Sequence, residues 1–163
     1  GIASAIVHNG EILANSGTAG EVGHGSATSG ELCACGGRGC LETYASAAGI
    51  ARRYSALSGQ QVAGAVEVLE KVQAGDPTAI EIWDTAIAGL ADLLSQIVRL
   101  LGKTRIVIGG GLSLAGPALF TPLAKATAAR LPIQPLPEIT PSAFADKSAI
   151  YGAALLGWDA AAC

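Results

Sequence analysis

The clearest hydrophobic pattern in the chain lies between Asp76 and Gly102. Large apolar residues recur there at intervals of three and four positions, at Ile80, Trp83, Ile87, Leu90, Leu94, Ile97 and Leu101. This spacing places all of them on one face of an α-helix. Asp76 is a capping acid followed by a proline, and Gly102 is a stop signal. We therefore expect one long amphipathic helix between the acid and the glycine.

Weaker patterns predict further helices on both sides of this one. They cover residues 41–57 ("LETYASAAGIARRYSAL"), residues 62–74 and residues 148–158. Pro117 and Pro122 mark two more helix starts, because proline is tolerated in the first turn of a helix.

Extended segments are expected at three places. The opening sequence "GIASAIVHNGEILANSG" has two short apolar runs around Asn9-Gly10, a dipeptide that favours the tight turn of a β-hairpin. Residues 104–113, "TRIVIGGGLS", form a β-branched strand that runs into three glycines, and residues 131–138 are extended and interrupted by prolines. The order hairpin, helices, strand, helix, strand, helix predicts an α/β layered domain.

Composition limits the class of protein. The 163 residues suit a single domain, and a formal net charge of -3 with scattered lysines and arginines argues against a nucleic-acid grip by this chain. We see no transmembrane segment and no signal peptide, so no membrane partner is expected. The sequence contains no methionine and opens on a strand-like segment, which leads us to expect a piece of a longer protein.

Three of the four cysteines are clustered in "CACGGRGC", residues 33–40, and they indicate a metal site. His24 precedes them by nine residues, and Cys33, Cys35 and Cys40 follow as C-x-C-x4-C. Three thiolates and one imidazole complete the tetrahedral shell of a structural zinc ion. The alternative is three buried or oxidised cysteines and an unrelated histidine, although the odd number of clustered thiols fits a reducing, cytoplasmic setting better.

A long loop, residues 16–40, surrounds this motif and carries two acids close to it. Glu21 lies three residues before His24, and Glu42 lies two residues after Cys40. A metal that joins His24 to Cys40 draws both carboxylates into one region, where they could accept hydrogen bonds from sugar hydroxyls. On spacing alone, solvated or helix-capping acids are an equal alternative.

The glycine turn at residues 106–113, "IVIGGGLS", is typical of a strand-to-helix connection that brings backbone amides close to a ligand. It has neither the G-x-G-x-x-G spacing nor the lysine of a phosphate-binding loop. A close-packed turn without a ligand is therefore an equal alternative.

Together, "AGEVGH", "CACGGRGCLETYAS" and "IVIGGGLS", in this order, resemble the ROK family of bacterial repressors, open reading frames and sugar kinases. "GIASAIV" and "YGAALLG" are similar to the glycine-rich strand and the closing helix of the same family. The resemblance covers nearly the whole chain. It implies an actin-like ATPase (ribonuclease-H-like) fold, of which residues 1–163 form the C-terminal lobe with a zinc-bound loop and the N-terminal lobe is absent.

The resemblance also implies roles for individual residues, in a zinc and sugar motif at residues 20–42 and a nucleotide-cleft turn at residues 106–113. The zinc ligands of the family match His24, Cys33, Cys35 and Cys40. The positions that contact sugar hydroxyls match Glu21, His24 and Glu42. The turn that lines the nucleotide cleft matches Gly109, Gly110 and Gly111.

Two departures from the family pattern bear on activity. Family kinases carry a D-x-G-G-T-like phosphate loop and an aspartate base in an Asn-Asp pair, and neither occurs here. Because phosphoryl transfer needs both, we expect this chain alone to be inactive as an enzyme. Ala3 and Ala5 also stand where family kinases usually have glycines, which crowds the approach of phosphate.

These features favour the sugar-binding effector domain of a transcriptional repressor, which would contact DNA only through a segment outside this chain. The alternative is the C-terminal half of an ATP-dependent sugar kinase, glucokinase-like, which alone would require ATP and Mg. A third possibility is a zinc-stabilised assembly domain without a ligand. For the first two, the expected ligand is a monosaccharide, a hexose or an N-acetylhexosamine; the protein is expected to be a cytoplasmic homo-oligomer.

Overall fold

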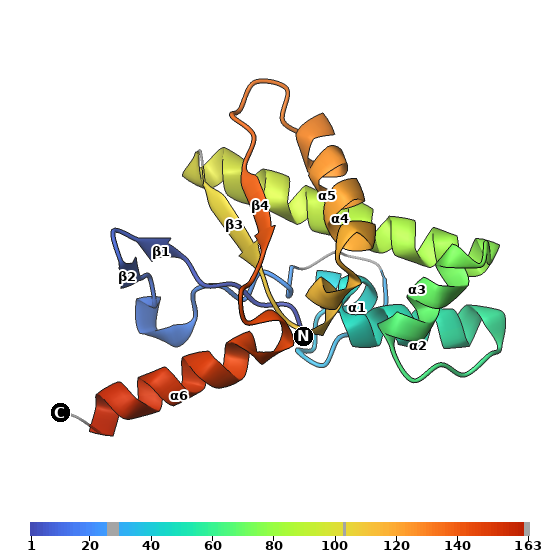
Figure 1. The fold of residues 1–163 in the computed structure, drawn as a ribbon, viewed down its shortest axis with the longest axis horizontal. Helices are drawn as coiled ribbons and strands as arrows, with labels where there is room; N and C mark the ends of the chain where they lie inside the picture. Colours follow the sequence, from blue (N-terminus) through green and yellow to red (C-terminus); the bar gives the residue numbers. More distant parts are fainter. Residues whose placement is uncertain (26–29, 103, 162–163) are drawn as a thin grey trace. The chain divides into compact units, whose positions relative to one another are not determined.

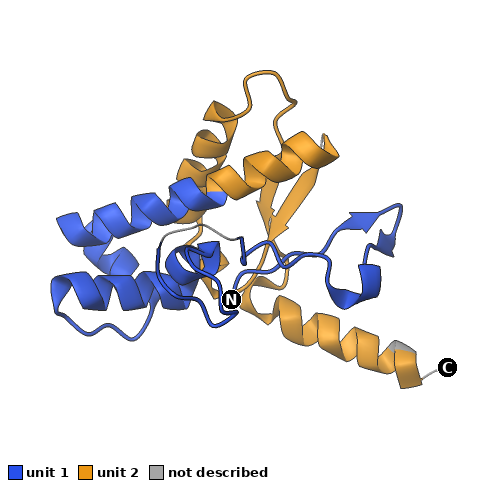
Figure 2. Cartoon of the chain, turned by 180° about the vertical axis from the view of Figure 1, so that it is seen from behind, with its two compact units in different colours: residues 1–90 blue, residues 91–163 orange. Residues whose placement is uncertain are grey.

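The computed structural model describes residues 1–25, 30–102 and 104–161 (Figure 1). The chain divides into two compact units, residues 1–90 and residues 91–163 (Figure 2). The division falls within the longest helix, α4 (Pro77–Leu101).

Unit 1 consists of a hairpin, a long loop and a group of helices. Its elements are β1 (Val7–His8), β2 (Glu11–Ile12), the 3-10 turn η1 (Asn15–Gly17), α1 (Leu41–Ala45), α2 (Ala47–Ser58), α3 (Ala65–Gln73) and the first part of α4. The predicted hairpin is confirmed, with Val7 opposite Ile12 and with positive φ angles of 53° and 84° at Asn9 and Gly10. These two angles are the ones that the tight turn requires.

The long helix also follows the sequence prediction. It runs from Pro77 to Leu101, and a carboxylate oxygen of Asp76 accepts a hydrogen bond of 3.0 Å from the backbone N–H of Ala79. The second carboxylate oxygen accepts a 2.7 Å bond from the hydroxyl of Tyr54 on α2. Asp76 therefore caps α4 and links it to a fully buried side chain of α2.

The predicted single helix at residues 41–57 is wrong, because the structure has two helices separated at Ser46. Ser46 has extended backbone angles (φ −72°, ψ 158°), and its hydroxyl accepts a hydrogen bond from the N–H of Gly49 as the cap of α2. A Cβ on Gly49 would lie 2.5 Å from the carbonyl oxygen of Thr43. The close turn between α1 and α2 therefore depends on the absence of a side chain at Gly49.

The core of unit 1 is formed by the inward faces of these helices. Its most deeply buried large side chains are Ile50, Tyr54, Val68 and Ile82. Burial of such side chains is the main stabilising contribution in a domain of this kind. The predicted stripe of α4 supplies part of this core through Trp83 and Ile87.

Unit 2 is a parallel β-α-β arrangement followed by a helix. It contains the rest of α4, β3 (Arg105–Ile108), the 3-10 turn η2 (Gly111–Ala115), α5 (Pro117–Ala129), β4 (Glu138–Pro141), the 3-10 turn η3 (Ala145–Lys147) and α6 (Ser148–Ala161). β3 and β4 pair in parallel, with Arg105 opposite Glu138 and Ile108 opposite Pro141. The two helix starts predicted at Pro117 and Pro122 are one helix, since Pro122 lies inside α5.

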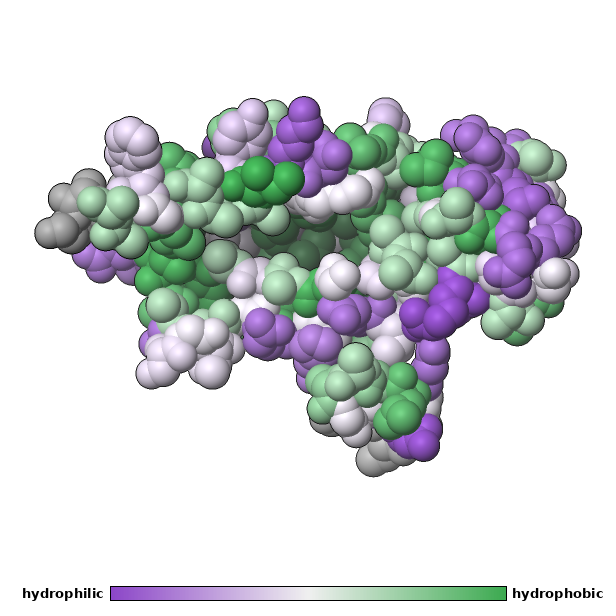
Figure 3. All heavy atoms as spheres, turned by 90° about the horizontal axis from the view of Figure 1, so that it is seen from below, coloured by the Kyte–Doolittle hydropathy of each residue, from purple (hydrophilic) through white to green (hydrophobic). Residues whose placement is uncertain are grey.

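The surface of α6 differs from that of the other elements. Its exposed large apolar side chains are Ile150, Tyr151, Leu155, Leu156 and Trp158. Figure 3, in which this helix faces the viewer, shows apolar surface along it. In the described part of the chain, no helix combines the length and the apolar character needed to cross a membrane.

Candidate metal centre and adjacent carboxylates

The first two cysteines lie on a tight hairpin in unit 1. Leu32 and Arg38 form an isolated antiparallel bridge, and the N–H of Cys33 donates to the carbonyl of Gly37 at 2.8 Å. The N–H of Gly36 donates back to the carbonyl of Cys33 at 3.0 Å, and Gly36 has a φ of +86°. This left-handed residue closes the turn, so that the side chains of Cys33 and Cys35 lie close together.

The third cysteine lies at the N-terminus of α1. The carbonyl oxygen of Cys40 accepts two hydrogen bonds from Thr43, one from the backbone N–H at 2.9 Å and one from the hydroxyl at 2.7 Å. Cys40 is fully buried, and its position is therefore fixed by the first turn of the helix.

His24 reaches the cysteines from the other arm of the loop. The N–H of Glu42 donates to the carbonyl of Gly23 at 3.1 Å and thereby joins this arm to α1. Gly23 has no room for a side chain, because a Cβ would lie 2.2 Å from the carbonyl oxygen of Ile2. The loop residues 26–29 lie outside the described part of the chain.

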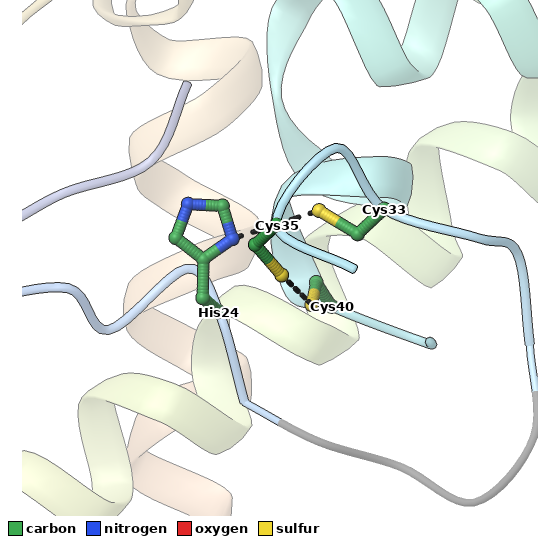
Figure 4. A group of neighbouring side chains, drawn as sticks. All are labelled: His24, Cys33, Cys35 and Cys40. Carbon is green, nitrogen blue, oxygen red and sulfur yellow. Dashed lines mark hydrogen bonds between the residues drawn. The ribbon is translucent and has the colours of Figure 1, made fainter. Parts of the chain in front are cut away.

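The four predicted ligands converge on one another, as Figure 4 shows. Their ligand atoms all lie within 4.8 Å of one another. Nδ1 of His24 is 3.6 Å from Sγ of Cys33, and the Sγ atoms of Cys35 and Cys40 are also 3.6 Å apart. With metal–ligand distances of about 2.0–2.3 Å, neighbouring ligands of a tetrahedral zinc ion lie roughly 3.3–3.8 Å apart. The cluster could therefore hold a metal ion, and the two separations of 3.6 Å match those of a tetrahedral zinc site.

The surroundings of two of the cysteines shift their pKa values in opposite directions. Cys33, Cys35 and Cys40 are free thiols. Burial and the neighbouring thiols raise the pKa of Cys40 to about 12, whereas hydrogen bonding to the backbone of Gly37 and then to the adjacent cysteines lowers the pKa of Cys35. Three thiolates this close repel one another unless a positive charge lies between them, and a bound metal supplies that charge.

The second ring nitrogen of His24 faces the two acids singled out by the sequence. Nε2 lies 3.8 Å from Oε2 of Glu21 and 3.9 Å from Oε2 of Glu42. Glu42 and His24 are about one quarter exposed, and Glu21 is more open, with 61% of its side chain accessible. The three residues assigned to sugar contacts are thus brought together, and they share His24 with the metal cluster.

Glu42 has one further partner and adjoins a pocket. Its Oε2 accepts a hydrogen bond of 2.8 Å from the backbone N–H of Ile2, which fixes the carboxylate. An open pocket of about 300 Å³ lies on this part of unit 1. Its polar lining residues are Glu31, Glu42, Thr43, Ser46 and Arg52.

The pairing of Glu31 with Arg52 was not predicted from the sequence. Nε and Nη2 of Arg52 donate to the two carboxylate oxygens of Glu31 at 2.8 and 3.0 Å. These hydrogen bonds lower the pKa of Glu31 below its ordinary value. The two residues are 21 positions apart, and no periodic pattern joins them.

The glycine turn lies in unit 2, between β3 and η2. Gly110 has a φ of +83°, and its N–H donates to the carbonyl of Ala145 at 3.0 Å. A Cβ on Gly109 would lie 2.7 Å from the hydroxyl oxygen of Ser148, whereas one on Gly111 would meet open space. Packing within unit 2 thus accounts for Gly109 and for the amide of Gly110, and the assigned nucleotide contact remains a prediction.

Comparison with known proteins identifies related sequences over nearly the whole chain. The model of the ROK family matches residues 1–160. An N-acetylgalactosamine kinase of Shewanella sp. strain ANA-3 is 38% identical over 127 residues, which are 77% of this chain and 41% of that protein. Other relatives at 30–37% identity are glucokinases, N-acetyl-D-glucosamine kinases and an N-acetylmannosamine kinase. The chain spans about half the length of the curated relatives it matches.

Solved structures with the same fold include both a sugar kinase and a transcriptional regulator. The ROK hexokinase of Thermus thermophilus superposes with a TM-score of 0.82 and 29% identity, over 95% of this chain and 53% of that one. A ROK transcriptional regulator that is a homologue of the Escherichia coli MLC protein superposes with a TM-score of 0.70 and 23% identity, over 86% of this chain and 39% of that one. The predicted mixed α/β, actin-like fold class is thereby confirmed.

Proposed function

The chain belongs to the ROK family, and from this membership we propose that it is a zinc-stabilised carbohydrate-binding lobe. The observation that carries the proposal is the placement of the two ring nitrogens of His24. Nδ1 faces the sulfur of Cys33, and Nε2 faces both carboxylates. One side chain thus connects the metal cluster to the acids.

This arrangement gives each component a chemical role in the proposal. His24, Cys33, Cys35 and Cys40 hold a structural zinc ion, which orders the loop but takes no part in a reaction. Zinc on one ring nitrogen leaves the other as an N–H donor. Glu21 and Glu42 accept hydrogen bonds from sugar hydroxyls, because ionised carboxylates are acceptors only.

The geometry supports a hydroxyl-bearing ligand. The distances of 3.8 and 3.9 Å from Nε2 to the carboxylates exceed those of direct hydrogen bonds. A hydroxyl group in this space can accept from the imidazole and donate to a carboxylate. The names of the relatives, which are hexose and N-acetylhexosamine kinases, support a monosaccharide of one of these classes.

The relatives support the interpretation that the whole protein is a sugar kinase. This support is stronger than that given by the composition and motifs of the chain. In that case the chain is the C-terminal half of the kinase, and ATP and Mg are its cofactors, with Gly109–Gly111 lining the nucleotide cleft. The phosphate loop and the aspartate base then come from residues outside this chain.

Ala3 and Ala5 favour the second candidate, the effector lobe of a sugar-responsive repressor. Added Cβ atoms at these positions hinder the close approach of phosphate oxygens to the backbone. Sugar binding then changes DNA affinity through a difference in affinity between two arrangements of the protein. ATP-dependent turnover of glucose or an N-acetylhexosamine by the full-length protein decides between the kinase and the repressor.

Calorimetric sugar titrations test the shared part of both candidates. We expect Glu21→Gln and Glu42→Gln, in the zinc-loaded full-length protein, each to weaken sugar binding about 10- to 100-fold, since hydrogen bonds to charged groups contribute roughly 1.5–3 kcal/mol. Zinc content stays unchanged in both variants. Glu70→Gln, on the exposed surface of α3, is the control and binds sugar as the wild type does. Unchanged titrations in the two site variants refute the sugar role.

A further inference from the structure

The side chain of Arg52 on α2 bonds to both arms of the chain that flank the cysteines. On one side its Nε and Nη2 donate to the carboxylate of Glu31 at 2.8 and 3.0 Å. On the other side Nη2 donates to the carbonyl oxygen of Thr43 at 2.7 Å. The rigid guanidinium plane therefore sets the distance between these two arms.

The Glu31 arm leads directly into the cysteine hairpin. Glu31 precedes Cys33 by two residues, and its carbonyl oxygen accepts a 2.9 Å hydrogen bond from the N–H of Gly39. A Cβ on Gly30 would lie 2.8 Å from the Cα of Gly39, so the two strands of the hairpin are tightly packed here. A shift of Glu31 would therefore carry Cys33 with it.

The Thr43 arm carries the remaining cysteine. Thr43 is buried, and both its N–H and its hydroxyl donate to the carbonyl of Cys40. Any movement of the Thr43 backbone is thus passed on to Cys40, whose Sγ lies 3.6 Å from that of Cys35.

We propose that Arg52 and Glu31 are positioning residues for the metal site, which hold the arms of Cys33 and Cys40 at the distance that coordination requires. This inference rests on the proposed zinc site. Groups that hydrogen-bond directly to metal ligands typically change metal affinity about 10- to 100-fold when they are mutated, and we expect the lower end of this range for Arg52 and Glu31, which act through the backbone of the two arms.

Because Arg52 and Glu31 are both exposed, positioning of the metal ligands can be distinguished from a contribution to global stability. The Arg52 and Glu31 side chains are 49% and 46% exposed. Exposed ion pairs contribute little to the global stability of a protein. A positioning role therefore predicts a large change in metal retention together with a small change in the melting temperature of the zinc-free protein.

The chain offers two matched controls. Arg53, the neighbour on α2, donates to the carbonyls of Tyr44 and Ile82 and to the hydroxyl of Thr85. Asp92 pairs with Arg130 in unit 2, which is another arginine–carboxylate pair near the surface. Arg53→Gln and Asp92→Asn remove side-chain hydrogen bonds and a charge but leave the hydrogen bonds of Arg52 with Glu31 and Thr43 in place.

The test measures the transfer of Zn²⁺ from the loaded 163-residue protein to an excess of a chromogenic chelator. We expect Glu31→Gln and Arg52→Gln to release zinc about tenfold faster than the wild type, and Arg52→Lys to fall in between, because lysine keeps the charge but loses the fork. The two controls release zinc at the wild-type rate. The thiolate absorption of the Co²⁺-substituted protein gives a second readout of ligand geometry, which the Glu31 and Arg52 variants alter.

Two results overturn the inference. In the first, the Glu31→Gln and Arg52→Gln variants release zinc at the wild-type rate and their Co²⁺ spectra are unchanged. The other is equal acceleration in the Arg53→Gln control, which indicates a general loosening of α2. A wild-type protein that holds no zinc refutes the metal site itself, and this outcome is distinguishable because it appears before any variant is made.

Discussion

The cysteine loop of unit 1 and the glycine turn of unit 2 were both predicted to contact ligands, and they are built in different ways. In the loop, four side chains between residues 24 and 40 point their ligand atoms at one another. In the turn, Gly109 packs against Ser148, and the N–H of Gly110 is engaged by Ala145. In the loop, the ligand atoms face one another and are available to a metal ion. In the turn, contacts within unit 2 already occupy the space at Gly109 and the N–H of Gly110.

This difference shows what kind of motif can be assigned from sequence. Cysteines and a histidine at such spacing have few roles other than metal binding, so their pattern predicts both the type of ligand and a tetrahedral arrangement. Glycines are required wherever backbones or side chains approach closely, with or without a ligand. Substitutions in the loop and in the turn should therefore differ in their effects.

Loss of a metal ligand is expected to have the largest effect. Cys40→Ser removes a buried thiolate, and the apparent binding free energy of structural zinc is on the order of 10 kcal/mol in small zinc modules. We expect the variant to lose its zinc and to melt roughly 10 °C or more below the wild type. Metal analysis and a thermal melt followed by circular dichroism measure both effects.

Cys163→Ser is the control for this variant, because that cysteine belongs to no predicted ligand set. It should retain zinc and the wild-type melting temperature. A Cys40→Ser protein that keeps its zinc and melts like the wild type contradicts the assignment of Cys40 as a ligand.

Alanine substitutions in the glycine turn are expected to have intermediate effects that depend on position. Gly109→Ala places a Cβ 2.7 Å from the Ser148 hydroxyl, which is itself hydrogen-bonded to Ala145 and Ser142, and we expect a loss of about 1–3 kcal/mol in the free energy of unfolding. Gly111→Ala meets open space and should stay within about 0.5 kcal/mol of the wild type. Urea denaturation measures the difference, and equal effects at the two positions contradict the packing explanation.

The smallest effect concerns the acid stability of unit 1. The hydrogen bond from Tyr54, followed by those from the backbone of α4, lowers the pKa of Asp76. Its stabilising contribution is therefore complete above the ordinary carboxyl pKa and is lost as the pH falls through the lower folded value. Asp76→Asn should melt a few degrees lower at neutral pH, and the gap should close in acid.

Melting temperatures over a pH series test this prediction. Asp84→Asn, an exposed acid on the same helix, is the control and should follow the wild type throughout. A gap that stays constant down to acid pH shows that the charge of Asp76 has no stabilising role.

The sequence predicted those elements whose ends carry local signals. α4 has a capping acid, a proline, a periodic stripe and a terminal glycine, and its bounds followed from them. The break between α1 and α2 has only a weak local signal, because serine is a common helix cap but also occurs within helices. The close approach of Gly49 to the carbonyl oxygen of Thr43 exists only in the folded chain, so the sequence pattern alone did not place the break.

The candidate site was likewise predictable only in part. From the spacing we predicted that Glu21 and Glu42 lie near His24, because a metal that joins the loop to α1 draws them together. In the structure the two carboxylates lie 3.8 and 3.9 Å from Nε2 of His24. The partnership of Glu31 with Arg52 depends on the packing of the hairpin against α2, and sequence separation gave no indication of it.

The zinc content of the purified 163-residue protein is the direct test of the metal site. We expect close to one zinc ion per chain in the wild type, retained through dialysis against buffer without metal. A content well under one, in protein that is folded and whose cysteines are reduced, contradicts it.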